Sequence, residues 1–242
     1  MATMPISPQT LYNDAPRIVI WEMTRACALA CRHCRAEAIP HRNPGELTTS
    51  EAFALVDQVA HCGDPIFVLT GGDPLMRDDI YKVVEYATNK GLRVAVSPSA
   101  TGRLRAEALQ ALSRAGCKRI SLSIDAATEE EHDRFRGVKG SFKRTVDGAH
   151  WAREAGLEVQ INTTISRFNH ETIWDLVPTL EQLDIALWSL FFIVPTGRAK
   201  IEDVLSAQET EEAFRRLYGV SKTASFHVKT TEAPHYRRFV AQ

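Results

Sequence analysis

Apolar residues recur along the chain in two alternating patterns. Short runs rich in β-branched and aromatic residues, typical of buried strands, occupy residues 17–24, 65–70, 92–97, 118–123, 157–163 and 187–194. Between them, apolar residues repeat at helical spacing, as in Ile80, Val83, Val84 and Ala87, and in Phe142, Thr145 or Val146, Ala149 and Ala152. The chain is therefore expected to contain six strands that alternate with helices.

Glycines mark the ends of four expected helices, and a strand run follows each of them: Gly63, Gly91, Gly116 and Gly156. Thr48 and Glu51 form a capping-box pattern at the start of a helix expected over 49–61, and another helix is expected over 105–115. The repeated order predicts an α/β fold with parallel strands and right-handed crossovers. Alternation alone leaves both an open sheet and a barrel possible.

Polar residues and glycines gather just after each expected strand. They are Thr24 and Arg25, residues 71–74, residues 97–99, Ser123 and Asp125, residues 162–164, and residues 195–198. Because the carboxyl ends of parallel strands form the ligand face of such folds, we expect these segments to converge on one site. The competing interpretation is that strand ends are polar simply because loops are polar.

Composition and charge narrow the class of protein. Of the 242 residues 44% are hydrophobic, which favours one large core. The net charge of −1 gives no general electrostatic attraction to nucleic acid or anionic membrane. The longest apolar run, 185–194, is about half the roughly 20 residues of a membrane span. The segment 1–17 lacks the apolar core of a secretory signal, and five cysteines is an odd number, so we expect a reduced cytoplasmic compartment.

Three cysteines are concentrated after the first strand. Cys27, Cys31 and Cys34 have the spacing CxxxCxxC, and Arg25, Arg32 and Arg35 are expected to favour their thiolates. Three thiolates can hold a cubane iron–sulfur cluster by three of its irons and leave the fourth iron open. The missing fourth cysteine is then the functional feature of the motif.

Other interpretations stay open at this point. The three cysteines could instead bind structural zinc, with His33 or His41 as the fourth ligand. Gly-Gly after a strand could cradle phosphate, although no GK[ST] follows.

Other residues are assigned no function. Cys62 and Cys117 have no partner at ligand spacing and are interpreted as packed or incidental thiols, and Asp125 is assigned no catalytic role. The aromatic residues of the sixth strand are interpreted as core: Trp188, Phe191 and Phe192.

From Arg17 to about Arg198 the chain resembles the radical S-adenosylmethionine (SAM) superfamily, whose signature is CxxxCxΦC with an aromatic residue at Φ. His33 occupies that place here, and the resemblance implies that it contacts the cofactor. TGGDP at 70–74 resembles the GGEP motif of the family, SLSID at 121–125 its fourth-strand motif, and HDRFRG at 132–137 a loop that ends in a functional arginine.

The resemblance implies a role for each matching residue. The backbone of Gly71, Gly72, Asp73 and Pro74 is expected to bind the methionine amino group of SAM. Ser123 is expected near the SAM carboxylate or ribose, Arg136 is expected to pair with the carboxylate, and Asn162 is expected to face the ribose.

The resemblance also implies the fold and the reaction. The fold is a partial (β/α)6 TIM-like barrel holding one 4Fe-4S cluster through Cys27, Cys31 and Cys34. An electron from the reduced cluster cleaves SAM to methionine and a 5′-deoxyadenosyl radical, which abstracts a hydrogen from a small-molecule or peptide substrate. An electron donor such as flavodoxin or ferredoxin is expected. The non-enzymatic alternative is a zinc- or iron–sulfur-binding module.

The expected domain organisation has three parts: an N-terminal lead-in over 1–16, a core barrel over 17–200, and a C-terminal helix and strand segment over 201–242. HDRFRGVKGSF and PTGRA at 195–199 resemble members with a cysteine-rich C-terminal extension, the SPASM type, which modify ribosomal peptides or tetrapyrrole side chains. No cysteine follows Cys117, so the chain is expected to be either a fragment of a longer protein or a version consisting of the core alone.

Overall fold

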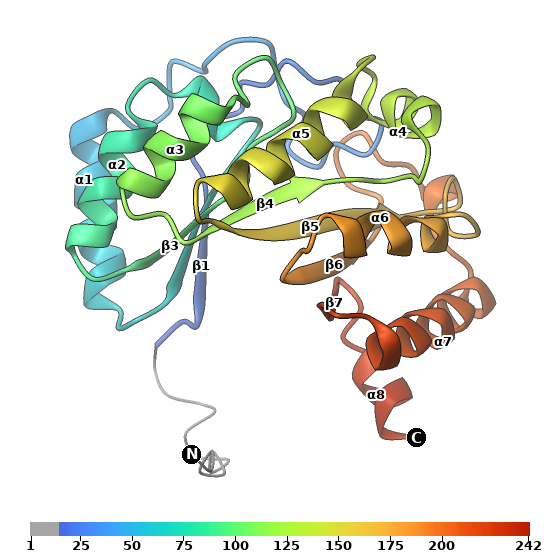
Figure 1. Ribbon diagram of the computed structural model, residues 1–242. Coiled ribbons are helices and arrows are strands. Elements are labelled where there is room, and N and C mark those ends of the chain that lie inside the picture. Colours follow the sequence, from blue (N-terminus) through green and yellow to red (C-terminus); the bar gives the residue numbers. More distant parts are fainter. Residues whose placement is uncertain (1–14) are drawn as a thin grey trace.

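One parallel sheet dominates the computed structural model, which describes residues 15–242. Seven strands follow one another in sequence order, and each is parallel to its neighbours: β1 (Ile18–Glu22), β2 (Ile66–Thr70), β3 (Arg93–Val96), β4 (Arg119–Ser123), β5 (Glu158–Ile165), β6 (Leu187–Phe192) and β7 (His227–Thr231). The sheet curls into a partial barrel with β1 and β7 at its two edges (Figure 1). The predicted partial barrel is confirmed, with seven strands where six were expected, because β7 of the C-terminal segment pairs with β6.

Helices cover the convex side of the sheet (Figure 1). They are α1 (Thr49–His61), α2 (Ile80–Asn89), α3 (Ala106–Arg114), α4 (Glu129–Arg136), α5 (Ser141–Glu154), α6 (Val177–Gln182), α7 (Ala207–Thr223) and α8 (Tyr236–Ala241). The capping box predicted at the start of α1 is confirmed, since the Thr48 hydroxyl accepts from Glu51 N–H and the Glu51 carboxylate accepts from Thr48 N–H.

The expectation that HDRFRG forms a loop is wrong. These residues form the last turns of α4, which ends at Arg136. The helix lacks a long apolar stripe, so hydrophobic periodicity misses it. Charge stabilises it instead, because acidic residues fill its first turn, Arg134 and Arg136 lie in its last turn, and the Thr128 hydroxyl caps its N-terminus.

The two faces of the strands have different surroundings. In β5 every second residue is buried, and the buried face packs against the helices. The alternate residues are more accessible and face the concave interior. At the β1 edge this inner face includes Ile18 and Ile20, which are 45% and 62% exposed. The concave side of the sheet is therefore available for a ligand.

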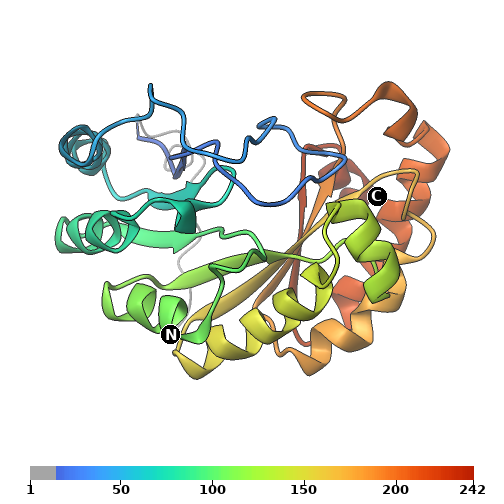
Figure 2. The ribbon, with the colours of Figure 1, turned by 90° about the horizontal axis from the view of Figure 1, so that it is seen from above.

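The segment between β1 and α1, residues 23–48, crosses the concave side of the sheet (Figure 2, blue). Thr24 Oγ1 and Arg25 N–H both donate to the Glu46 carboxylate at 2.9 Å. The buried Arg77 guanidinium donates to the Met23 carbonyl at 3.2 Å and to the Leu47 carbonyl at 2.9 Å. These bonds hold both ends of the segment that carries the three cysteines, which we call the cysteine loop.

Among the described residues, no helix is long and apolar enough to span a membrane. The prediction about the N-terminal lead-in concerns mainly residues 1–14, which lie outside the part of the chain that the structure describes.

Candidate active site

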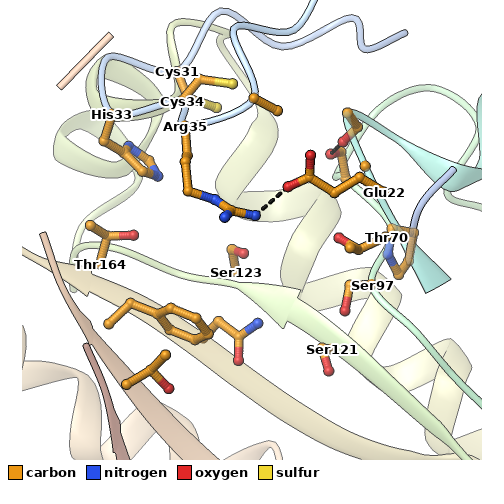
Figure 3. Close-up of a pocket in the computed structure, with 18 of the residues that line it drawn as sticks. Glu22, Cys31, His33, Cys34, Arg35, Thr70, Ser97, Ser121, Ser123 and Thr164 are labelled. Carbon is orange, nitrogen blue, oxygen red and sulfur yellow. Dashed lines mark hydrogen bonds and ion pairs between the residues drawn. The ribbon is translucent and has the colours of Figure 1, made fainter. Parts of the chain in front are cut away.

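A cavity of about 750 Å³ opens on the concave side of the sheet beneath the cysteine loop. The predicted convergence of the strand ends is confirmed, because its walls include Thr70 to Gly72, Ser97 to Ser99, Ser123, Asn162, Thr164, Thr196 and Arg198. Hydroxyl side chains from neighbouring strands form much of its floor: Thr70, Ser97, Ser121, Ser123 and Thr164 (Figure 3).

The thiols of Cys27, Cys31 and Cys34 all line this cavity. Leu29 N–H donates to Cys27 Sγ and Ala38 N–H donates to Cys34 Sγ, both at 3.4 Å. These backbone amides orient two of the sulfurs from within the loop itself. Burial raises the pKa of the Cys27 thiol, so a positive centre that binds this sulfur would favour its thiolate.

The three arginines that were expected to favour the thiolates have other partners. The arginine that contacts a thiol comes from another part of the chain. Arg25 donates to backbone carbonyls, Arg32 lies over the Phe168 ring and Arg35 pairs with Glu22. The guanidinium in contact with a thiol comes from α4, where Arg136 Nη1 lies 3.8 Å from Cys31 Sγ. Spacing along the loop could not reveal this contact, because Arg136 is distant from Cys31 in the sequence.

The other two cysteines do not line the cavity. Cys62 is exposed at the end of α1, and Cys117 is buried at the start of β4 with its pKa raised by burial to about 11. Within residues 15–242 no three His, Cys, Asp or Glu side chains stand close enough to share a single metal ion. Three thiolates that each bind a different iron of a cluster lie farther apart than the ligands of one ion.

The GGDP segment packs its backbone against the cysteine loop. Gly72 N–H donates to the Thr24 carbonyl and Asp73 N–H to the Ala26 carbonyl, both at 2.7 Å. A Cβ on Gly72 would lie 2.4 Å from the Ala26 carbonyl oxygen, so only glycine permits this approach. Gly71 and Gly72 line the cavity.

Asp73 and Pro74 are buried behind this part of the cavity wall. The Asp73 carboxylate accepts from Thr101 Oγ1 at 2.7 Å, Leu75 N–H at 3.1 Å and Ser99 N–H at 3.3 Å. Burial raises the pKa of this carboxyl group. These hydrogen bonds stabilise the turns after β2 and β3. Because the side chain is used in them, Asp73 can contact a ligand only through its backbone.

Ser123 and Asn162 line the cavity, as predicted. They are register partners, with Ser123 the last residue of β4 and Asn162 inside β5, which continues to Ile165. The Asn162 Oδ1 atom accepts from Gln160 Nε2 at 2.7 Å, which fixes the amide plane.

Arg136 lines the cavity and pairs with a carboxylate of the protein itself. Its Nε donates to Asp125 Oδ2 at 2.5 Å, and Asp125 is fully buried. Burial, the largest single influence, raises the pKa of Asp125, but the Arg136 charge, the two nearby histidines and the hydrogen bond from Thr164 N–H together hold that pKa below its usual value. Asp125 Oδ1 also accepts from Thr164 N–H at 2.8 Å. Asp125 thus ties β4, β5 and α4 together.

His132 is buried and His33 is partly buried in the cavity wall, and each has a buried ring nitrogen without a hydrogen-bond partner among residues 15–242. His33 stacks on Phe135 with ring centroids 4.4 Å apart, and Phe135 stacks on Phe168. Burial, together with the nearby Arg136 charge, lowers the pKa of His33 to about 4. Burial lowers the pKa of His132 to about 4 as well, so both rings are neutral at pH 7.

Several cavity residues were given no ligand role in the sequence analysis, among them His132, Arg198 and Phe191. His132 belongs to the HDRFRG stretch and Arg198 to PTGRA, so the signal was present in motifs that had been noticed for other reasons. The interpretation of Phe191 as core is wrong, because its side chain is half-buried and faces the cavity. Trp188 and Phe192 are buried as expected.

The family model described as "Radical SAM superfamily" matches residues 21–183. The chain belongs to the radical SAM superfamily. An AdoMet-dependent heme synthase of Nitratidesulfovibrio vulgaris is 44% identical over 239 residues, which cover 97% of this chain and 65% of that relative. The mycofactocin maturase MftC of Mycobacterium tuberculosis H37Rv is 34% identical over 186 residues, covering 76% of this chain and 46% of that relative. The chain thus spans just under two thirds of the length of the heme synthase.

The fold is also that of solved members of the superfamily. Streptococcus suis SuiB bound to S-adenosylmethionine superposes with a TM-score of 0.77 at 17% identity, covering 90% of this chain and 51% of that chain.

The residues of this radical SAM protein fit the cofactors of the family. Three thiols, the donor set for three irons of a cluster, share one cavity with buried polar atoms that have no hydrogen-bond partner among residues 15–242. Those buried atoms, on His33, His132 and Arg198, call for a polar ligand next to the thiols.

Proposed function

We propose that this chain binds one 4Fe-4S cluster through Cys27, Cys31 and Cys34, binds SAM in the same cavity, and starts a radical reaction on a bound substrate. One observation carries the proposal. The three thiols and six of the eight residues expected to contact SAM line a single cavity: His33, Gly71, Gly72, Ser123, Arg136 and Asn162.

When bound, the reduced cluster supplies the electron that cleaves SAM to methionine and a 5′-deoxyadenosyl radical, which abstracts a substrate hydrogen. The protein contributes binding, orientation and shielding. The cysteine loop covers the concave side of the sheet and limits the access of water to the cavity. Backbone amides at Leu29 and Ala38 orient two thiolates. Ser123 and Asn162 present hydrogen-bonding groups from adjacent strands, where a ribose or carboxylate can be held.

The substrate class that we favour is a tetrapyrrole with carboxylate side chains. The specific support is the similarity to the heme synthase, which extends over 97% of this chain, against 76% for the peptide maturase. Peptide maturation is the second candidate, supported by that shorter similarity. Reduced flavodoxin or ferredoxin is proposed as the electron donor.

The proposal is tested by anaerobic reconstitution of this chain with iron and sulfide, followed by reduction in the presence of SAM. We expect a brown protein with about four irons per chain that forms 5′-deoxyadenosine. Iron coproporphyrin III is expected to accelerate this formation more than a precursor peptide does. A protein that takes up about one zinc and stays colourless would support the binding-module alternative. A fully loaded protein that forms no 5′-deoxyadenosine would refute the enzymatic proposal.

A further inference from the structure

Four arginines line the cavity, and three of them are neutralised by a carboxylate. The ion pairs are Arg35 with Glu22, Arg119 with Glu158, and Arg136 with Asp125. The fourth arginine, Arg198, differs because its Nε and Nη2 atoms are buried without a hydrogen-bond acceptor among residues 15–242. A buried charged donor without an acceptor is destabilising, and a ligand that brings the acceptor removes that cost.

The backbone fixes Arg198 beside the third cysteine. Arg198 N–H donates to the Cys34 carbonyl at 3.1 Å. The preceding residue, Gly197, has φ of +61°, and a Cβ there would lie 2.4 Å from the same carbonyl oxygen. The turn after β6 is thus pressed against the cysteine loop. The backbone of Arg198 therefore has a defined position in the cavity wall, and its side chain is not a loose surface side chain.

Two histidines in the same cavity wall, His33 and His132, also have a buried ring nitrogen without a hydrogen-bond partner among residues 15–242. In the described part of the chain, the buried side-chain nitrogens and oxygens without a partner belong to His33, His132 and Arg198, which all line this cavity. His132 Nδ1 accepts from Asp125 N–H at 3.1 Å, so its free Nε2 atom carries the proton. The unsatisfied buried side-chain groups of the described residues are therefore concentrated in this cavity and include at least three N–H donors.

The charge balance favours a single negative charge. Asp125 neutralises Arg136, Glu22 pairs with Arg35 and Glu158 pairs with Arg119, so among the cavity arginines Arg198 carries the positive charge that no carboxylate of residues 15–242 compensates. The Nε and Nη2 atoms lie on one edge of the planar guanidinium group and present parallel N–H bonds that match the two oxygens of a carboxylate.

We propose that Arg198 is the carboxylate receptor of this cavity, binding a carboxylate in bidentate fashion through Nε and Nη2. The inference rests on the proposed function, because the carboxylate comes either from the methionine part of SAM or from a side chain of the substrate. The assignment differs from the expectation based on family resemblance, which gave the SAM carboxylate to Arg136. The Nε atom of Arg136 is engaged by Asp125, and its Nη1 atom faces Cys31.

The test is the Arg198→Gln variant with two pairs of ligands. SAM is compared with decarboxylated SAM by equilibrium dialysis on the reconstituted protein. Iron coproporphyrin III is compared with its tetramethyl ester by absorbance titration, with and without the cluster. We expect Arg198→Gln to weaken binding of one of the two acids by about ten- to a hundredfold while its carboxylate-free analogue is unaffected. The acid that is affected identifies the source of the carboxylate.

Two further variants make the test specific. Arg153→Gln removes an arginine outside the cavity that has a carboxylate partner, Asp184, and it is expected to change each affinity by less than about twofold. Arg198→Lys keeps the charge but loses the bidentate fork, so it is expected to lower the preference for the acid only partly. If Arg198→Gln fails to take up the cluster, Arg198→Lys decides the question.

Three results would overturn the proposal. One is unchanged affinity of Arg198→Gln for both acids, and another is an equal loss for acid and analogue. The third is a change confined to the electron paramagnetic resonance (EPR) signal of the cluster, which would assign Arg198 to the cluster itself. Failure of the wild-type protein to take up iron would contradict the proposed function instead, while the titration without the cluster still tests Arg198.

Discussion

The buried ion pair between Arg136 and Asp125 gives a prediction that needs no cofactor. The Asp125 side chain is 0% exposed and the Arg136 side chain 13% exposed. In the Arg136→Met variant, the Asp125 carboxylate would remain in the interior without its counter-charge. Removal of one partner of a buried pair typically costs about 3–5 kcal/mol. For a protein of this size that corresponds to a fall in melting temperature of about 6–20 °C.

Arg119 provides the matched control. It pairs with Glu158 at 2.6 Å, but these side chains are 35% and 59% exposed. Since solvent-exposed pairs contribute about 0–1 kcal/mol, Arg119→Met is expected to lower stability by less than about 1 kcal/mol. A double variant, Asp125→Asn with Arg136→Met, removes both charges and is expected to recover much of the loss, because no isolated charge stays buried.

The assay is thermal and urea denaturation of the four proteins without cluster at pH 7. The order of stability should be wild type, Arg119→Met, the double variant, and Arg136→Met. If Arg136→Met were no less stable than Arg119→Met, or if the double variant were no more stable than Arg136→Met, the reasoning about the buried pair would be refuted.

Other expectations concern pH and the glycines. The pKa values of His33 and His132 lie at about 4 in the fold, below the ordinary 6.5. Between pH 6.5 and 4 only the unfolded chain binds these protons, so stability is complete above pH 6.5 and falls toward pH 4 by up to roughly 3 kcal/mol per histidine. Denaturation midpoints that stay constant over this range would contradict this. Gly72→Ala should destabilise the protein and impair cluster uptake because of its contact with the Ala26 carbonyl, whereas Gly102→Ala, with nothing within 4 Å, should do neither. A Gly72→Ala protein of normal melting temperature and iron content would argue against the close backbone approach.

The strands and most helices could be predicted because parallel strands buried by helices require continuous apolar runs. β7 was not recognised as part of the barrel because HVKTT is an edge strand with Lys229 exposed, so it lacks such a run. The three cysteines could be found because metal ligation depends on local spacing. The partners of Arg136 and Arg198 could not, since a pairing between residues distant in sequence is decided only when the chain folds.

The residues proposed to contact SAM divide in the same way. Gly71 and Gly72 could be located because a close approach between two backbone segments requires glycine, which is visible in the sequence. The side chain of Asp73 points into the turns behind the cavity. The GGDP motif alone does not predict this orientation.

The most direct test of the central claim is the iron content and EPR spectrum of six reconstituted proteins: wild type and the single alanine variants of Cys27, Cys31, Cys34, Cys62 and Cys117. Cys62 and Cys117 lie outside the cavity and are the matched controls. We expect about four irons per chain and the signal of a reduced 4Fe-4S cluster in wild type and both controls, with most of the iron lost in the other three variants. Equal loss of iron in all five variants, or full iron content in any of the Cys27, Cys31 and Cys34 variants, would contradict the assignment of the cluster to these three cysteines.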